Sequence, residues 1–475
     1  MNFYSFLLDK ISCFKDKVAL TNQKDIYITY EELVLIINGI SCQLNSTLKK
    51  NSRVLLLISN PYLETIYLLA TVASGNIATP CTVHYGNEYC KNIINEAEPD
   101  LIIADFPNIG LLETKEKVLS VSFEALPKKK DPELYEASTS MLFLFTSGTT
   151  GTPKGVMLSH EGMIKNVQSI FDYFELTKNK RLLISRPLFH VAVLTGELLV
   201  GLYSGIQITF SDDFSPLSIV KTLSDQKIDV MCGTPTLFNY LGMLIRRSKK
   251  EIWLKKAAIS GEKMVPAIVD RLKTFFSDVD FFHVYGMTEA SPRITYLSPK
   301  LFYIKPTSIG QPLKNIEAKI IDEENNIVKR PEQIGELVVK TPSVMQGYWK
   351  NPEATQEKII DGWLMTGDLA YFDSEGYYYI VGRKDNMIIK AGVNIYPETI
   401  ENKLLESEFI EDVIAYGAQN VNLGQEIHID MIINDDKFDI YGYCKAVLPQ
   451  HHWPQKINIV KEIRKGPSGK KIRRR

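Results

Sequence analysis

The most informative segment of this chain reads Phe145-Thr-Ser-Gly-Thr-Thr-Gly-Thr-Pro-Lys-Gly-Val156. It follows an apolar run from Ser140 to Phe145, which predicts a strand that enters a loop. Glycines let backbone N–H groups turn inward, hydroxyls donate hydrogen bonds, and a lysine adds positive charge. The segment therefore predicts a loop that cradles phosphate groups, although a flexible polar surface loop has a similar composition.

This loop differs from the phosphate-binding loop of the common nucleotide hydrolases. That loop needs Gly-Lys followed by Ser or Thr, because the hydroxyl after the lysine ligates magnesium. Here Lys154 lies between Pro153 and Gly155. The spacing therefore disfavours a kinase-like or GTPase-like enzyme.

The bulk composition is that of a large globular protein. The chain has 475 residues and a formal net charge of -1, which predicts two or three structural units and gives no reason to expect nucleic acid as a partner. Its six cysteines are scattered without a Cys-x-x-Cys pair, so we expect reduced thiols and a cytoplasmic location. Residues 1–17 lack the apolar core of a signal peptide, and no run of about 18 apolar residues predicts a membrane span.

Strands and helices alternate along most of the chain, which predicts α/β architecture with parallel sheets. Val54 to Ile58 is an apolar strand, and Ile77 to Cys81 is another. Between them Asn60-Pro61 predicts the start of a helix with proline at its first position. The same pattern recurs at Ser215-Pro216 and Asn351-Pro352.

The pattern becomes shorter and more mixed near the C-terminus. We expect helices at 401–407 and 441–448, and strands near 413–416 and 427–433. These elements predict a small α+β domain. Its boundary falls in the charged segment from Gly382 to Asn386, so we expect a large domain over residues 1–384 and a small one over 385–475.

Further motifs follow the first loop: Tyr285-Gly-Met-Thr-Glu289, Gly362-Trp-Leu-Met-Thr-Gly-Asp368, Gly376-Tyr-Tyr-Tyr-Ile-Val-Gly-Arg383 and Ser468-Gly-Lys470. One such motif can arise by chance, whereas the whole set in this order can hardly do so. Together the motifs resemble the signatures of the adenylate-forming superfamily, which contains acyl-CoA synthetases, amino-acid adenylation domains and luciferases. They are most similar to those of acyl-CoA synthetases. The resemblance implies a large AMP-binding domain with several subdomains and a small, mobile lid domain.

The implied reaction brings two anions together, because a carboxylate attacks the α-phosphate of ATP. The site therefore needs cations and hydrogen-bond donors that are aimed at the phosphoryl group. The resemblance assigns ATP and AMP binding to Thr146, Ser147, Gly148, Thr149, Thr150, Gly151, Lys154, Gly261, Glu262, Tyr285, Gly286, Asp368 and Arg383. In this scheme Tyr285 stacks on adenine and Asp368 accepts hydrogen bonds from the ribose.

Three residues carry the catalytic assignments: Thr288, Glu289 and Lys470. Glu289 would hold Mg²⁺, a hard ion that prefers oxygen ligands, and Thr288 can donate to the α-phosphate. Lys470 matches the family lysine that bridges the attacking carboxylate and the α-phosphate. A solvated basic tail is the plainer explanation, but the turn of small residues before Lys470 favours a presented lysine. Many relatives carry proline where this chain has Arg464.

Two positions relate to the second half-reaction, in which the acyl group passes to a thiol. Asp385 matches the family's hinge, where a few residues absorb the rotation of the small domain. Gly392 leaves room for a narrow pantetheine arm, although a plain turn glycine is the alternative.

The acyl pocket is assigned mainly to apolar residues. Amino-acid adenylation domains carry an Asp where this chain has His190, and histidine cannot replace that counter-ion. An aliphatic or aryl monocarboxylate is therefore favoured, since no fixed charge is evident in the predicted wall. Arg293 could bind a second carboxylate, but a structural ion pair is the commoner role. The predicted lining consists of His190, Val191, Leu194, Gly196, Gly233, Thr234, Met287 and Ala290.

The resemblance thus implies a ligase that uses ATP and Mg²⁺ to form an acyl adenylate and then transfers the acyl group to coenzyme A. One alternative is loading of the phosphopantetheine of an acyl or peptidyl carrier protein. A regulatory nucleotide-binding relative is disfavoured because Lys470 and Glu289 are both present. No sequence feature indicates a luciferase-type oxygenase.

Overall fold

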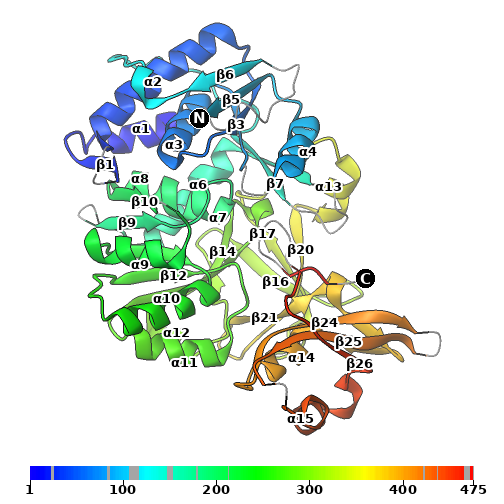
Figure 1. Ribbon diagram of the computed structural model, residues 1–475. Coiled ribbons are helices and arrows are strands. Elements are labelled where there is room, and N and C mark those ends of the chain that lie inside the picture. Colours follow the sequence, from blue (N-terminus) through cyan, green and yellow to red (C-terminus); the bar gives the residue numbers. More distant parts are fainter. Residues whose placement is uncertain are drawn as a thin grey trace.

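The fold was analysed in a computed structural model that describes residues 1–22, 26–82, 86–105, 117–146, 153–177, 180–211, 213–420, 423–435, 437–464 and 471–473. A large α/β domain with several sheets is followed by a small α+β domain (Figure 1). This architecture confirms the predicted fold class.

The first sheet carries the predicted phosphate loop. Its inner strands run parallel, and its β7 and β8 pair antiparallel at one side. The strand order is β18 (Gly347–Tyr348), β8 (Lys154–Leu158), β7 (Leu142–Thr146), β4 (Ile77–Pro80), β3 (Arg53–Leu57), β5 (Leu101–Asp105) and β6 (Val118–Val121).

The second sheet is also parallel at its centre and antiparallel at both edges. Its strand order is β15 (Gln311–Pro312), β14 (Arg293–Leu297), β13 (Asp280–Gly286), β12 (Lys256–Ile259), β11 (Val230–Gly233), β9 (Arg181–Ile184), β10 (Gln207–Phe210), β1 (Val18–Thr21) and β2 (Tyr27–Thr29).

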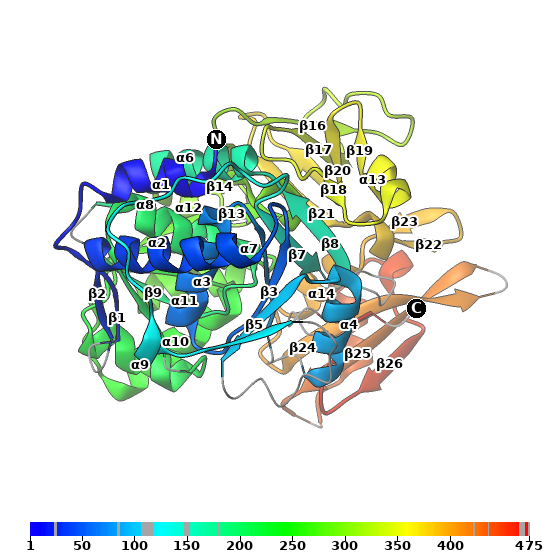
Figure 2. The ribbon, with the colours of Figure 1, turned by 90° about the horizontal axis from the view of Figure 1, so that it is seen from above.

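Helices cover these two sheets, and their buried faces form the main hydrophobic cores. Figure 2 shows α2 beside α3, and α3 packs against β3 and β4 of the first sheet. The helices of this region are α1 (Phe3–Ile11), α2 (Tyr30–Thr47), α3 (Pro61–Ala73), α4 (Asn87–Ala97), α6 (His160–Phe174), α7 (Val191–Val193), α8 (Val200–Ser204), α9 (Pro216–Asp225), α10 (Pro235–Ser248), α11 (Pro266–Phe275) and α12 (Pro299–Phe302). A π-helical turn, η3 (Leu194–Leu199), joins α7 to α8.

The predicted helix starts are confirmed where Asn or Ser precedes proline. The side chain of Asn60 accepts hydrogen bonds from the N–H groups of Tyr62 and Leu63, and Pro61 occupies the first turn of α3. Ser215 caps α9 and Asn351 caps α13 (Pro352–Lys358) in the same way. These caps satisfy N–H groups that have no partner within the helix.

A third, antiparallel sheet adjoins the small domain. Its order is β16 (Glu317–Ile321), β17 (Gly335–Lys340), β20 (Trp363–Phe372) and β19 (Ile359–Ile360), and β21 (Tyr378–Arg383) also pairs with β20. Ile320, Leu337, Val339 and Leu364 contribute to the core under this sheet.

The small domain has its own sheet and its own core. The long hairpin of β24 and β25 extends well beyond the predicted strands, because cross-strand pairing continues through polar residues. Helix α14 begins four residues before its predicted start, with Pro397 in its first turn. The elements are β22 (Ile388–Lys390), β23 (Val393–Ile395), α14 (Pro397–Leu404), β24 (Ile410–Asn420), β25 (Gly424–Ile433), α15 (Ile440–Val447) and β26 (Lys456–Ile459).

Candidate active site

The two ends of the predicted phosphate loop lie side by side. Thr146, the last residue of β7, pairs with Lys154, the first residue of β8. The two strands that flank the predicted loop are therefore antiparallel neighbours in the first sheet. Five predicted loop residues lie outside the described part of the chain, as does the predicted catalytic lysine: Ser147, Gly148, Thr149, Thr150, Gly151 and Lys470.

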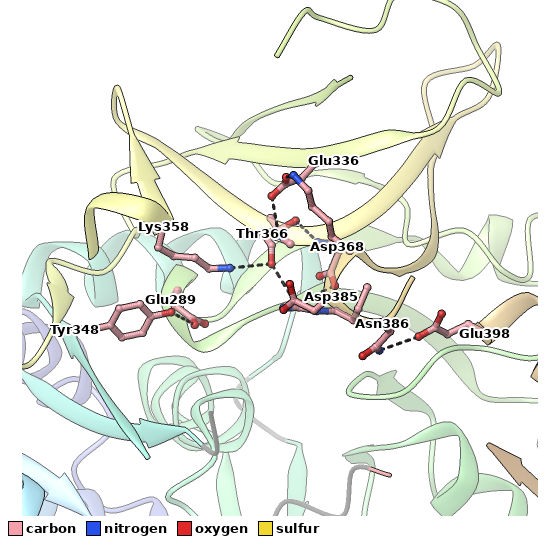
Figure 3. A network of polar contacts seen from close by, with 12 residues as sticks. Glu289, Glu336, Tyr348, Lys358, Thr366, Asp368, Asp385, Asn386 and Glu398 are labelled. Atoms are coloured by element: carbon pink, nitrogen blue, oxygen red, sulfur yellow. Dashed lines mark hydrogen bonds and ion pairs between the residues drawn. The ribbon is translucent and has the colours of Figure 1, made fainter. Parts of the chain in front are cut away.

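Tyr348 connects the loop lysine to the predicted metal carboxylate. The Nζ atom of Lys154 lies 5.3 Å from the ring centroid of Tyr348, within cation–π range. The hydroxyl of Tyr348 donates a hydrogen bond of 2.7 Å to Oε1 of Glu289 (Figure 3). Burial, followed by the charge of Glu289, raises the pKa of Tyr348, so its phenol remains a donor at neutral pH. Sequence analysis did not find Tyr348.

The donor set around Glu289 was tested for its fit to Mg²⁺. In the described ranges, no three His, Cys, Asp or Glu side chains gather into a group that could hold a metal ion. Mg²⁺ needs no such cage, because it keeps several waters and takes further oxygens from the phosphates of a nucleotide. The half-buried carboxylate of Glu289 therefore fits an Mg²⁺ ion that arrives with its nucleotide.

Tyr285, Asp368 and Arg383 form a second polar group. Asp368 on β20 is paired in register with Arg383 on β21. Nη1 of Arg383 donates to Oδ1 of Asp368 over 3.1 Å, and the hydroxyl of Tyr285 donates to Oδ2 over 2.5 Å. Burial, and next the charge of Asp368, raise the pKa of Tyr285 well above its usual range. The carboxylate is thus fixed from two sides, as the ribose role requires.

Gly286 lies in the chain between Tyr285 and Glu289, and the fold leaves no room for a side chain at this position. A Cβ atom at this position would lie 2.0 Å from the carbonyl oxygen of Pro292. The backbone after β13 therefore folds closely on itself. Thr288 and Glu289 follow in a short 3-10 turn, Thr288–Ala290, and the N–H of Met345 donates to the carbonyl of Glu289 over 2.8 Å.

Lys358 joins these two groups, and no sequence motif contains it. Its Nζ atom donates to the carbonyl oxygen of Thr366 over 3.0 Å, and Nη1 of Arg383 donates to the same oxygen over 3.1 Å. Burial lowers the pKa of Lys358, while the nearby carboxylates, Glu289 first, oppose that shift. Figure 3 shows its side chain pointing from α13 toward Thr366, close to Glu289 and Asp368.

The segment predicted to line the adenine pocket follows β12. Gly261 has a φ of +90°, a conformation that favours glycine. The side chain of Glu262 turns toward α10, where its Oε2 accepts a hydrogen bond of 2.6 Å from the hydroxyl of Thr236. The following residue, Lys263, donates from Nζ to the carbonyl of Val381 on β21. This segment thus contacts the strand that carries Arg383.

The predicted hinge lies in an exposed turn between β21 and the small domain. Asp385 is the middle residue of a 3-10 turn, Lys384–Asn386, and its Oδ2 lies 3.9 Å from Nη2 of Arg383. On either side, Lys384 pairs with Glu336 over 2.9 Å and Asn386 donates to Glu398 over 3.1 Å. Gly392 has a φ of +79° in the turn between β22 and β23, and the position of its missing Cβ faces open space.

The predicted acyl-pocket residues come from α7 and the π-helical turn η3, from the end of β11, and from the turn after β13. His190 precedes α7 as its N-cap residue, and its ring centroid lies 4.0 Å from that of Phe189. Gly233 ends β11 and Thr234 caps α10, where its hydroxyl accepts from the N–H of Leu237. Buried positions are Val191, Leu194, Gly196, Gly233 and Ala290, while Met287 is half-buried.

A charged side chain lies against Gly196, one of the predicted lining residues, for which no charged neighbour was expected. Nη2 of Arg293 lies only 2.6 Å from the position that a Cβ of Gly196 would occupy. The ion pair expected for Arg293 is not found among the described residues. Instead Arg186 pairs with Glu197, with 2.6 Å between Nη2 and Oε1. Sequence analysis missed this pair because neither residue belongs to a signature.

The family described as "AMP-binding enzyme" matches residues 8–349. The chain belongs to this family, which is part of the adenylate-forming superfamily. No helix in the described ranges of this AMP-binding enzyme is long and apolar enough to cross a membrane.

The AMP-binding enzyme resembles several curated proteins. It is 32% identical over 339 residues to a long-chain-fatty-acid–CoA ligase of Bacillus subtilis strain 168, an alignment that covers 70% of this chain and 60% of the relative. It is 31% identical to indoleacetate–CoA ligase of Aromatoleum aromaticum, over 70% of this chain and 64% of the relative. The match thus spans about 60% of the length of the first of these relatives.

Solved structures share the fold over nearly the whole chain. The anthranilate CoA ligase AuaEII in complex with anthranoyl-AMP matches with a TM-score of 0.90 at 21% identity, covering 99% of this chain and 96% of that one. The o-succinylbenzoate CoA synthetase of Bacillus subtilis in complex with its acyl-adenylate intermediate matches with a TM-score of 0.88 at 23% identity, covering 99% and 97%.

Proposed function

We propose that this enzyme uses ATP to convert a carboxylic acid to an acyl adenylate and then transfers the acyl group to the thiol of coenzyme A. The observation that supports this most strongly is a set of polar contacts in which Lys358 and Arg383 donate to the carbonyl of Thr366, Arg383 binds Asp368, and Lys358 feels the charge of Glu289. It joins a carboxylate suited to Mg²⁺ to a carboxylate suited to ribose, beside the strands that flank the phosphate loop.

In the first half-reaction, a carboxylate oxygen of the acid attacks the α-phosphorus of ATP. The bond from that phosphorus to the bridging oxygen breaks, and pyrophosphate leaves. Asp368 accepts the ribose hydroxyls, held in place by Tyr285 and Arg383. Lys154 and the loop hydroxyls hold the leaving phosphates, and Lys470 bridges the two reacting anions.

Mg²⁺, when bound, neutralises charge on the phosphates, and Glu289 would hold it. The hydroxyl of Tyr348 donates to Oε1 of that carboxylate and so holds its side chain in position. Thr288 precedes Glu289 in the same 3-10 turn. In this proposal its hydroxyl donates to the α-phosphate.

In the second half-reaction, the thiol attacks the acyl carbon and AMP leaves. We propose that the small domain, residues 385–475, rotates against residues 1–384 between the two steps, with Asp385 as the hinge. The separate core of the small domain supports such a motion. The turn at Gly392 would then face the active site and give room to the pantetheine arm.

Coenzyme A is favoured as the thiol by the curated relatives, which are named long-chain-fatty-acid–CoA ligase, indoleacetate–CoA ligase and feruloyl-CoA synthase. A carrier protein with a phosphopantetheine arm remains the second candidate, because both acceptors present the same thiol on the same arm.

The test is a pyrophosphate-release assay over a panel of carboxylic acids, with coenzyme A and a pantetheinylated carrier protein offered separately. The panel includes 2-amino analogues of matched length, which should be poor substrates because His190 offers no counter-ion for an ammonium group. Glu289→Gln should abolish pyrophosphate release. Glu375→Gln, at an exposed carboxylate that is not part of the candidate site, should not. Failure of every acid to release pyrophosphate would contradict the proposal.

A further inference from the structure

A cluster of charged and polar side chains, two of them buried and two half-buried, lies against Gly196 of the predicted acyl pocket. We call Tyr173, Arg186, Glu197 and Arg293 the arginine cluster. Glu197 is 1% exposed and Arg293 is 2% exposed. Only Arg186 and Glu197 form an ion pair within it, over 2.6 Å. Such groups rarely occupy a protein interior without a set of partners.

The charges of this cluster do not balance. Within the described ranges, no carboxylate oxygen lies within ion-pair distance of the guanidinium of Arg293. The cluster therefore holds two guanidinium groups and one carboxylate, and that carboxylate is paired with Arg186 alone. Burial raises the pKa of Glu197 against the opposing effect of Arg186, which can only increase the excess of positive charge. An anion from outside the chain would remove this imbalance.

Each member of the cluster also has a buried polar atom without a hydrogen-bond partner in the described structure. These atoms are Tyr173 Oη, Arg186 Nε, Glu197 Oε2 and Arg293 Nε. Buried polar atoms in native proteins are nearly always paired, so a set of orphans in one place indicates that water or a ligand completes it. The excess charge favours an anionic ligand over water.

The position of Gly196 connects the cluster to the acyl pocket. A Cβ atom on Gly196 would lie 2.6 Å from Nη2, 3.1 Å from Cζ and 3.2 Å from Nε of Arg293. The guanidinium therefore lies flat against the backbone of Gly196, where any side chain would displace it. Gly196 belongs to the π-helical turn that follows α7, the short helix that begins after His190. Turns of this kind are rare and occur often at functional sites.

Arg293 is also close to the reacting centre along the chain. It begins β14, four residues after Glu289, and the turn between them is fixed by Asn166, whose Nδ2 donates to the carbonyls of Ala290 and Arg293. Arg293 thus contacts Gly196, a predicted lining residue, and closely follows the predicted Mg²⁺ carboxylate in the chain.

We propose that the carboxylic acid carries a second anionic group, most simply a second carboxylate, and that Arg293 binds it at the end remote from the adenylated carboxyl. The inference rests on the proposed function and adds the class of substrate. A guanidinium recognises a carboxylate through two parallel hydrogen bonds, which gives orientation as well as affinity. Arg186 remains paired with Glu197 and helps to hold the second anion by charge.

The test compares kcat/KM for pyrophosphate release with matched pairs of acids, both linear and aromatic. The members of each pair differ only in whether the remote end carries a carboxylate or a methyl group. In the unaltered enzyme the dicarboxylate should be preferred by about tenfold or more, because a site built for a polar group rejects an analogue that lacks it. Arg293→Met should lower the value for the dicarboxylate by about a hundredfold and spare the monocarboxylate.

Two further variants separate binding of the second anion from a structural role. Arg293→Lys should retain part of the preference, and Gly196→Ala should reduce it by displacing the guanidinium. Arg246→Met, at an exposed position on α10, is the matched control and should change nothing. Folding of each variant is checked by its thermal unfolding temperature and by the increase in that temperature when ATP is added.

The outcomes distinguish this inference from the function on which it rests. If the unaltered enzyme uses the monocarboxylates as well as the dicarboxylates, the inference is wrong while the ligase activity stands. Equal loss of both acids in a folded Arg293→Met protein also contradicts it. If no acid of any kind releases pyrophosphate, the proposed function fails and the inference fails with it.

Discussion

Tyr285 and Asp368, on strands of two different sheets, are joined by a hydrogen bond of 2.5 Å from the phenol to Oδ2. The contact fixes the carboxylate assigned to the ribose before any nucleotide is present. Arg383 holds the other oxygen over 3.1 Å. Preorganisation of this kind reduces the free-energy cost of binding, because the side chains need not be ordered by the ligand.

The first prediction tests that contact. Tyr285→Phe removes the donor to Asp368 and should raise KM for ATP about five- to tenfold, the equivalent of one ordinary hydrogen bond. Steady-state kinetics with varied ATP measure the effect. Tyr441→Phe, at an exposed tyrosine of the small domain, is the control. An unchanged KM for ATP would show that the contact has no part in nucleotide binding.

The second prediction concerns Lys470. Lys470→Ala should abolish adenylate formation and largely spare thioester formation from supplied acyl-AMP, since this lysine is assigned only to the step in which the carboxylate meets ATP. Single-turnover assays measure the two half-reactions separately. Lys461→Ala, at a lysine earlier in the same C-terminal segment, is the control. Equal loss of both half-reactions would refute the assignment of two conformations.

The third prediction concerns the hinge. Asp385→Pro fixes φ at this position and disfavours the helical conformation of Lys384, which precedes it in the turn. Adenylation should survive, and transfer to the thiol should fall. The same two single-turnover assays apply. Should transfer stay intact while adenylation collapses, Asp385 is not the hinge.

The fourth prediction is a pH dependence of stability. Nδ1 of His160 accepts a hydrogen bond from the N–H of Phe3 over 3.0 Å, and Nε2 faces the hydroxyl of Ser138. Burial lowers the pKa of His160 from 6.5 to about 4. A protonated ring cannot accept from Phe3, so acid should loosen the attachment of α1.

The direction follows from proton binding. As the pH falls below 6.5, the unfolded chain takes up a proton on this histidine that the folded chain refuses until about pH 4. The contribution of neutral His160 to the free energy of unfolding is therefore fully present above pH 6.5. It is lost toward pH 4, by up to about 3 kcal/mol. His160→Asn should flatten the decline in unfolding free energy between pH 7 and pH 5, measured with urea. His451→Asn, at an exposed site, is the control, and equal slopes in both variants would contradict the prediction.

Local features of the fold were the easiest to predict from sequence. Asn60, Ser215 and Asn351 cap their helices as expected, because a cap depends only on the next few residues. Boundaries that depend on partners were less accurate. The hairpin of β24 and β25 is longer than its apolar pattern, since pairing with a neighbouring strand also stabilises polar positions.

The candidate site divides in the same way. Residues within signatures, such as Glu289 and Asp368, were found because their neighbours identify them. Lys358 lies in no signature, and only the folded chain brings it to Thr366. The separation of Arg293 from Gly196 along the sequence likewise gave no reason to expect contact between them.

The fate of the carboxylate oxygens tests the central claim most directly. The acid is labelled with ¹⁸O in its carboxylate and incubated with ATP, Mg²⁺, coenzyme A and the enzyme, and the products are analysed by mass spectrometry. Attack of the carboxylate on the α-phosphorus, followed by cleavage of the acyl–oxygen bond, must leave one labelled oxygen on AMP. The account predicts singly labelled AMP and unlabelled pyrophosphate. Unlabelled AMP, or label in orthophosphate, would contradict it.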